Sequence, residues 1–141
     1  MISIVIPTFN NLSYLKICIN SIKNNSKFRH EIKLHINDGS DGTLEYANKN
    51  NIFYTHSKIN IGLCSSINMI CSKVSQKYIL YAHDDMYFCP HWDVGLIDEI
   101  NTFKHDNFFL SGTLIEAHTG HIKFNCGENL ESFDEKKLLD N

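Results

Sequence analysis

Two adjacent carboxylates, Asp84 and Asp85, follow a short apolar run that extends from Tyr78 to Ala82. The run is aromatic and aliphatic, which is typical of a buried strand. The two acids would then lie just past the carboxyl end of this strand, where open α/β sheets bind their ligands. Like charges so close together are costly unless a positive group joins them, and a divalent cation that carries a phosphate is such a group. Taken alone, the pair fits a capped turn equally well.

The composition is that of a soluble globular protein, with 141 residues of which 43% are hydrophobic and 21% are charged. This length suffices for one domain with a core. The net charge is -3 and no long basic run occurs, so we expect no nucleic-acid partner. The sequence shows neither a membrane-spanning stretch nor a signal-peptide pattern, which favours a cytoplasmic location. A peripheral association with the inner membrane face stays open.

The cysteines and histidines do not indicate a zinc site. The five Cys include no CxxC pair, and we read them as reduced thiols that mostly fill the core. The eight His are scattered along the chain. His83 and His91 flank Cys89 and form the closest group, but such residues more often face solvent or form hydrogen bonds than bind a metal.

The hydrophobic pattern predicts strands that alternate with helices. Strands are expected at 2–6, 31–36, 52–55 and 78–82, with helices at 12–25, 44–50 and 60–74 between them. The inner face of the third helix should be formed by Leu63, Ile67, Ile70 and Cys71. Pro7 should end the first strand, Asn11 should cap the first helix, and Asp41 or Thr43 should cap the second. Further along, we expect a helix at 94–103, strands at 108–115 and 122–124, and a helix at 135–139.

Helices of this length between strands favour right-handed crossovers and a parallel sheet. The doubly wound solution places the strands in the order 3-2-1-4 with helices on both faces. Residues 7–10 and 83–86 would then face one crevice, with Asp38 one strand further along. The signatures GxGxxG and GxxxxGK followed by Ser or Thr are absent, which disfavours a dinucleotide-binding domain and a P-loop enzyme.

Four motifs in a fixed order carry a resemblance that covers about the first ninety residues. They are Pro7-Thr8-Phe9-Asn10, Asn37-Asp38-Gly39-Ser40-Asp41-Gly42-Thr43, Asn60-Ile61-Gly62 followed by Asn68, and His83-Asp84-Asp85-Met86. In these motifs the chain resembles family 2 glycosyltransferases of the GT-A fold. The resemblance implies an α/β, Rossmann-like domain with a mostly parallel sheet. Residues 1–90 would form its donor-binding half, and residues 91–141 a short or truncated acceptor-side half of the same domain.

The resemblance also implies an activity. Family members transfer a sugar from a nucleotide-diphosphate sugar, most often UDP- or dTDP-linked, to a glycan or lipid-linked acceptor, often with Mn2+ or Mg2+. Such a role belongs to polysaccharide biosynthesis. The alternative is a nucleotide-sugar-binding module without turnover. A nucleotidyltransferase fits less well, since its Gly-rich, Lys-bearing amino-terminal loop is absent. A homodimer stays open.

Matching the donor motifs residue by residue implies roles for five positions. Thr8 and Phe9 match positions that line the base and ribose, and Phe9 could stack on the base or simply pack at the strand end. Pro7 and Asn10 complete this donor-binding segment. Asp38 matches the acid that accepts a hydrogen bond from the uracil imide, a role that suits a carboxylate because it is only an acceptor.

The later motifs imply a donor contact and a metal ligand, with two departures from the family pattern. Asn68 matches a retained Asn in the donor-binding set, but Ile67 stands where many members carry Arg. His83 stands where a DxD motif would place its first acid. On the xDD form, Asp85 is the metal ligand and Asp84 lies nearer the ribose or donor sugar. Hard oxygen ligands suit Mg2+ or Mn2+.

The catalytic base stays unknown. If the chain is active, we expect an inverting reaction in which an Asp or Glu takes the proton of the acceptor hydroxyl. In the family that acid lies well beyond the DxD motif. The available candidates are Glu116, Glu128, Glu131 and Asp134, and each is more often a surface charge.

Overall fold

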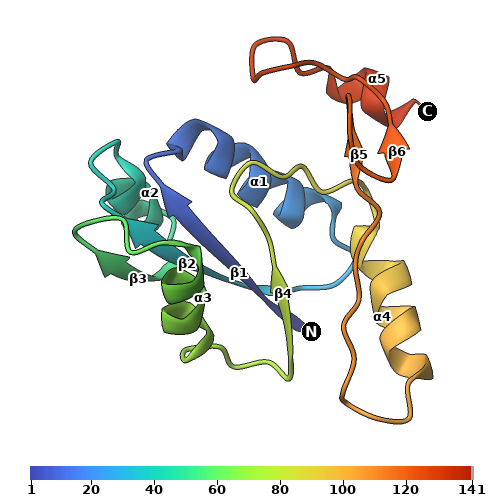
Figure 1. Cartoon of the computed structure of the whole chain (residues 1–141), viewed down its shortest axis with the longest axis horizontal. Helices are drawn as coiled ribbons and strands as arrows, with labels where there is room; N and C mark the ends of the chain where they lie inside the picture. Colours follow the sequence, from blue (N-terminus) through green and yellow to red (C-terminus); the bar gives the residue numbers. More distant parts are fainter. Residues whose placement is uncertain (141) are drawn as a thin grey trace. The chain divides into compact units, whose positions relative to one another are not determined.

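The computed structural model of the chain, described for residues 1–140, divides into two compact units. The first ends at Trp92 and the second begins at Asp93. The first unit contains β1 (Ile2–Phe9), α1 (Leu12–Asn25), β2 (Glu31–Asn37), α2 (Thr43–Lys49), β3 (Phe53–Ser57), α3 (Leu63–Cys71) and β4 (Tyr78–Tyr81). Its strands form one parallel sheet in the order β3-β2-β1-β4, which confirms the predicted order (Figure 1).

The core of the first unit lies between the sheet and the helices that cover one of its faces. β1 and β2 are rich in isoleucine, and alternate side chains of both strands point into this core. The buried cluster is Ile4, Ile6, Leu15, Cys18, Ile19, Ile22, Leu34, Ile36, Ala47, Ile52 and Ala82. Burying each large aliphatic side chain contributes roughly 1.5–3 kcal/mol. Because α3 packs on the opposite face, the sheet has helices on both faces, as predicted (Figure 1).

Pro7 does not end the first strand, which continues to Phe9. The register explains why the proline is tolerated. The Val5 carbonyl accepts the Ala82 amide on the β4 side, and Pro7 faces the same side two residues later. Pairing between β1 and β4 has stopped at Val5, so no strand lies there to require the amide hydrogen that proline lacks.

The third helix is shorter than predicted, and its buried face differs. It begins at Leu63 and ends at Cys71, and its buried residues are Ser66 and Ile70. Leu63, expected on the inner face, is 50% exposed. A small hydroxyl side chain therefore faces the sheet where the apolar pattern predicted leucine, and this difference becomes important at the site.

The second unit contains little sheet. It holds α4 (Trp92–Thr102), which begins at the last residue of the first unit, followed by β5 (Ile115–Glu116), β6 (Ile122–Lys123) and α5 (Glu135–Leu139). The strand predicted at 108–115 is wrong except for its last residue, because β6 offers partners only to Ile115 and Glu116. Phe109 is 92% exposed. Within residues 1–140, no helix is long and apolar enough to cross a bilayer.

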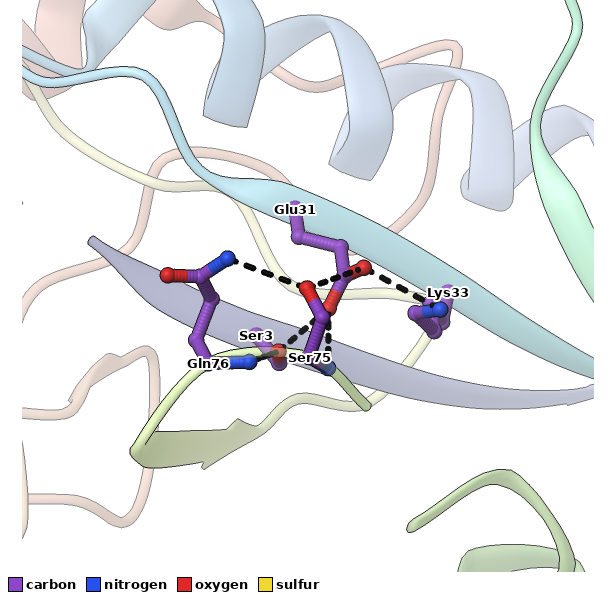
Figure 2. Close-up of polar contacts among 5 residues, drawn as sticks. All are labelled: Ser3, Glu31, Lys33, Ser75 and Gln76. Atoms are coloured by element: carbon purple, nitrogen blue, oxygen red, sulfur yellow. Dashed lines mark hydrogen bonds and ion pairs between the residues drawn. The ribbon is translucent and has the colours of Figure 1, made fainter. Parts of the chain in front are cut away.

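A polar network ties together the amino-terminal ends of β1 and β2 and the segment before β4 (Figure 2). The Glu31 carboxylate accepts hydrogen bonds from the Ser3 hydroxyl and from the Ser75 amide and hydroxyl, the last two at 3.1 and 2.9 Å. Lys33 Nζ lies 3.0 Å from Glu31 Oε1, and the backbone amide of Gln76 donates a hydrogen bond to Ser3 Oγ. Partial burial acts to raise the pKa of Glu31, but these hydrogen bonds outweigh it and lower the pKa to about 2.

We expect Glu31→Gln to destabilise the protein by roughly 1–3 kcal/mol at neutral pH, since a charged acceptor is lost. The pKa of Glu31 rises from about 2 in the folded protein to 4.5 on unfolding, so the carboxylate stabilises the fold above pH 4.5 and that contribution disappears as the pH falls toward 2. Urea unfolding between these pH values should therefore show a shallower pH dependence for the variant. Glu45→Gln, on the exposed side of α2, is the control, and equal slopes for all three proteins would contradict the assignment.

The Asp41 carboxylate joins the first turns of α1 and α2. Its Oδ1 accepts the Thr43 amide and hydroxyl at 3.1 and 2.6 Å, and its Oδ2 accepts the Leu12 amide at 2.8 Å. Burial acts to raise the pKa of Asp41, and the hydrogen bonds from Thr43 and Leu12 more than reverse this and lower it. Asp41 thus bonds the first amide of α2, although the N-cap position predicted for Asp41 or Thr43 is occupied by Gly42. It also bonds the first amide of α1, where Asn11 was wrongly expected to cap through its side chain.

Asp41→Ala should lower the free energy of unfolding by about 1–2 kcal/mol, because helix-terminal amides of α1 and α2 lose their acceptor. Asp41→Asn keeps one acceptor oxygen and should lose less. Urea denaturation measures both values. A loss in Asp41→Ala no larger than that in Asp98→Ala, an exposed position on α4, would show that Asp41 does not link the helices.

Candidate functional site

A cleft of about 350 Å³ opens at the carboxyl ends of β1, β2 and β4. This size suits a small-molecule ligand, and the location is the one expected for ligands of an open α/β sheet. The lining residues are Pro7, Thr8, Phe9, Asn10, Asn11, Asn37, Asn60, Gly62, Leu63, Ser66, Tyr81, His83 and Asp84. The structure therefore brings the first motif and Asp84 together, as the sequence predicted. Asp38, Asn68 and Asp85 are not among the lining residues.

Asp84 is fixed by two side chains from β1 and the start of α1. Thr8 Oγ1 donates to Asp84 Oδ2 at 2.6 Å, and Asn11 Nδ2 donates to Asp84 Oδ1 at 3.0 Å. These two bonds set the orientation of the carboxylate, and each oxygen keeps a further lone pair for a ligand. The sequence did not reveal the role of Asn11, because its place before a helix suggested an ordinary cap.

Asp85 differs from its neighbour in exposure and in partners. Its side chain is exposed, and no residue from 1 to 140 forms a hydrogen bond or ion pair with its carboxylate. The same part of the chain contains no group of three or more His, Cys, Asp or Glu that could hold a metal unaided. A cation at Asp85 would therefore need oxygen ligands from a bound molecule as well.

The buried thiol of Cys18 lies close to Asp84 and Asp85. The Cys18 thiol donates to the His83 carbonyl at 3.5 Å and is fully buried. Burial, reinforced by the charges of Asp84 and Asp85, raises the pKa of Cys18 to about 12. Burial and the same two acids also raise the pKa of Tyr81. Both groups therefore stay neutral at physiological pH beside a negatively charged turn.

The His83 side chain does not approach the acids as a metal ligand in a preformed cluster. Its ring packs against the Tyr81 ring, with centroids 5.1 Å apart and planes at 45°. Both rings line the cleft. Where a DxD motif would have its first acid, this chain therefore has a histidine whose ring lines the cleft together with that of Tyr81.

Asn10 and Asp38 are hydrogen-bonded neighbours, at the end of β1 and just beyond β2. Asn10 Nδ2 donates to Asp38 Oδ2 at 2.9 Å, and the Gly39 amide donates to Asn10 Oδ1 at 3.0 Å. Ser40 Oγ also donates to Asp38 Oδ2, at 3.2 Å. Within residues 1–140, no donor reaches Asp38 Oδ1, so one oxygen stays available as an acceptor.

The backbone at this end adopts unusual angles. Asn10 and Asp38 have φ values of 47° and 60°, in the left-handed region that Asn and Asp tolerate better than most residues. Gly39 follows with φ 83°, and a Cβ there would lie 2.8 Å from Leu44 and 2.9 Å from Ile36 side-chain atoms. Only glycine fits this close approach. The loop is thus held tightly where it presents Asp38.

Phe9 lies in the chain between Thr8, which holds Asp84, and Asn10, which holds Asp38. Its side chain is 50% exposed although it belongs to the central strand, and it lines the cleft. The alternative that Phe9 merely packs in the core does not fit this exposure. A half-exposed aromatic ring beside polar side chains is suited to stacking on a planar ligand.

Asn68 lies on the exposed side of α3 and does not line the cleft, so its donor contact stays a prediction. On the same helix, Ser66 is fully buried and lines the cleft instead. Sequence reasoning also missed Asn37, a buried residue at the end of β2. Its signal was present, because a polar residue at an inward position of an apolar strand must be hydrogen-bonded.

The four candidate bases all lie in the second unit. Asp134 Oδ1 accepts the Lys137 amide at 2.9 Å and caps α5. Glu116 accepts a hydrogen bond from the Thr119 hydroxyl. These contacts are local, and they leave the identity of a catalytic base a prediction.

Comparisons with known proteins find glycosyltransferases that are similar to this chain. The abequosyltransferase RfbV of Salmonella typhimurium is 39% identical over 70 residues, which cover 44% of this chain and 21% of that protein. The uncharacterized glycosyltransferase RC0461 of Rickettsia conorii is 29% identical over 120 residues, covering 79% of this chain and 19% of that protein. The chain therefore spans about a fifth of the length of these relatives.

Solved structures of S. aureus TarS share the fold. TarS 1-349 in complex with UDP superposes with a TM-score of 0.64 and 19% identity, covering 71% of this chain and 32% of that chain. The complex with UDP-GlcNAc gives a TM-score of 0.60 and 20% identity, covering 71% and 30%. The family model for glycosyl transferase family 2 matches residues 3–139, and the chain belongs to this family.

Proposed function

We propose that this chain provides the donor site of a glycosyltransferase that transfers a sugar from a UDP- or dTDP-linked donor to a glycan or lipid-linked acceptor. One observation carries the proposal: the half-exposed ring of Phe9 and the oriented Asp84 line the same cleft, and Asn10, next to Phe9 in that lining, holds Asp38 with its Oδ1 available. A ring that can stack on a base and an acceptor for its N–H suit a pyrimidine nucleotide.

The relatives support a nucleotide-sugar donor. The TarS structures that share the fold hold UDP and UDP-GlcNAc, and the related RfbV is named as an abequosyltransferase. On this proposal, Phe9 stacks on the base, Asp38 Oδ1 accepts the imide N–H, and Asp84 accepts hydroxyls of the ribose or donor sugar. Thr8 and Asn11 keep Asp84 in place for that contact.

A divalent cation, Mn2+ or Mg2+, fits the donor set. Asp85 offers an exposed, hard carboxylate that no residue from 1 to 140 engages, and a nucleotide diphosphate would contribute further oxygens. When bound, such an ion supplies positive charge beside the diphosphate leaving group. The residues of this chain then orient the donor and keep its base and ribose fixed.

The proposed reaction inverts the anomeric centre. The acceptor oxygen forms a bond to the anomeric carbon, the bond to the diphosphate oxygen breaks, and an Asp or Glu base takes the hydroxyl proton. Glu116, Glu128, Glu131 and Asp134 remain the candidates. The alternative is a nucleotide-sugar-binding module without turnover, which would bind the donor but release no free sugar in a hydrolysis assay.

Calorimetry with UDP, dTDP and GDP tests the base contact directly. We expect UDP and dTDP to bind more tightly than GDP, and Asp38→Asn to lose about 1.5–3 kcal/mol of UDP binding, roughly tenfold to a hundredfold in affinity. Asp98→Asn, on α4, is the matched control. Equal UDP affinity in Asp38→Asn and the wild type would exclude the base contact, and no binding of any nucleotide would overturn the proposal itself.

Asp85→Ala separates the metal contact from the base contact. In the wild type, Mn2+ should raise UDP affinity, and the variant should lose most of that gain, about tenfold or more, by comparison with other losses at metal sites. Uridine, which has no phosphate, should bind both proteins equally. An undiminished Mn2+ effect in Asp85→Ala, with Asp98→Ala as control, would mean that another group holds the ion.

A further inference from the structure

The Asn37 side chain lies at the centre of the first unit, where β2 ends, and is only 4% exposed. Its Nδ2 donates to the Thr8 carbonyl at 3.3 Å and to Ser66 Oγ at 3.1 Å. Its Oδ1 accepts Ser57 Oγ and the Ile61 amide, both at 3.0 Å. One carboxamide therefore connects β1, the end of β3, the loop after β3, and α3.

These contacts occupy both N–H donors of the Asn37 amide. Its oxygen accepts the Ile61 amide and shares the single Ser57 hydroxyl hydrogen with the Ile59 carbonyl, which lies 2.8 Å from Ser57 Oγ. A carboxamide has two N–H donors and an oxygen with two lone pairs. The orientation of the Asn37 amide is also determined, because the Thr8 carbonyl can only accept and the Ile61 amide can only donate. A ligand in the cleft would find no N–H donor left on Asn37, although the residue lines the cleft.

The network continues into the sheet with a fixed direction. The single hydroxyl hydrogen of Ser57 goes to Asn37 Oδ1 at 3.0 Å or to the Ile59 carbonyl at 2.8 Å, and both can only accept. His35 Nε2, 3.2 Å from Ser57 Oγ, must therefore be the N–H donor. His35 Nδ1 then accepts from Thr55 Oγ1 at 2.8 Å. Burial lowers the pKa of His35, so this uncharged tautomer is the expected form at neutral pH. Through Ser57 and His35, the Asn37 side chain is thus connected to the sheet as well as to the loops.

Three of the four partners of Asn37 lead to the lining of the cleft. Thr8 uses its hydroxyl to hold Asp84. Ile61 precedes Gly62, whose amide is bonded to Asn60 Oδ1 at 2.9 Å. Ser66 Oγ donates to the Gly62 carbonyl at 2.7 Å, in the first turn of α3. The amide therefore controls the spacing between the acid side and the α3 side of the cleft.

We propose that Asn37 is the positioning residue of the nucleotide site, holding the Thr8 backbone and the loop before α3 at the separation that binds the donor, without contacting the donor itself. The inference rests on the proposed donor site. It goes beyond that site because it assigns the site's geometry to a buried amide. The Thr8–Asp84 contact and the 60–62 loop then respond together to a change at Asn37.

The test is Asn37→Asp, which keeps the shape of the side chain and its two acceptor bonds. The change replaces the donor with a carboxylate oxygen facing the Thr8 carbonyl, so this contact becomes repulsive. We expect UDP affinity to fall about tenfold or more, since misplacement of positioning groups is costly. Ile52→Ala, a core change at a residue that does not line the cleft, is the control for lost stability.

Amide hydrogen exchange supplies a readout that a general loss of stability would not reproduce. The Ile61 amide should stay protected in Asn37→Asp, which retains its acceptor, and exchange faster in Asn37→Leu, which does not. Ile52→Ala should leave UDP affinity unchanged. Should Asn37→Asp fail to fold, Ser57→Ala carries the test: it removes the hydroxyl that Asn37 shares with the Ile59 carbonyl and should weaken UDP binding, while the Ile61 amide keeps its acceptor and stays protected.

The outcomes separate the two proposals. Wild-type protein that binds neither UDP nor dTDP overturns the donor site, and the inference with it. A UDP affinity equal to that of the wild type in Asn37→Asp, or in Ser57→Ala if Asn37→Asp does not fold, overturns the inference alone. An equal loss of UDP affinity in Ile52→Ala would also overturn it, because the effect would then follow stability.

Discussion

The cleft exists because β1 continues to Phe9 although its pairing with β4 stops at Val5. Beyond that point the central strand has a neighbour on only one side. Polar groups at such an open edge need partners from elsewhere. The turn after β4 supplies one of them, since Asp84 accepts the Thr8 hydroxyl. The same mismatch in strand length that leaves room for a ligand thus brings a carboxylate to its edge.

Three asparagine side chains at this edge each hold a different part of the site. Asn10 holds Asp38 and the Gly39 amide, Asn11 holds Asp84, and Asn37 connects the strands to α3. An amide can donate and accept at once, so it can join a carboxylate or carbonyl to a backbone N–H without adding charge. The site is consequently ordered by neutral groups, and its charge is concentrated in the few carboxylates that face the cleft or solvent.

The sheet order and most helices could be predicted because they follow from hydrophobic period and alternation. The failures have physical causes. The Pro7 boundary depended on where β4 stops, which no local pattern contains. The strand at 108–115 had the right composition but lacked a partner, since β6 is only Ile122–Lys123. At the site, the carboxylates could be picked out from the sequence. The roles of Asn11 and Asn37 could not, even though Asn37 stood out as a polar residue in an apolar strand, because their contacts join residues distant in the chain.

The electrostatic character of this edge of the sheet comes from two adjacent acids, Asp84 and Asp85, whose surroundings differ. Neither Asp84 nor Asp85 forms an ion pair within residues 1–140, and the nearby Cys18 and Tyr81 are both kept neutral, their pKa values raised by burial and by these acids. A diphosphate alone would meet repulsion here. Asp84 is already oriented by two neutral donors, but Asp85 has no such partner, so it is Asp85 that leaves negative charge uncompensated. The proposed cation follows from this asymmetry: it would join a free carboxylate to an anionic ligand that the turn would otherwise repel.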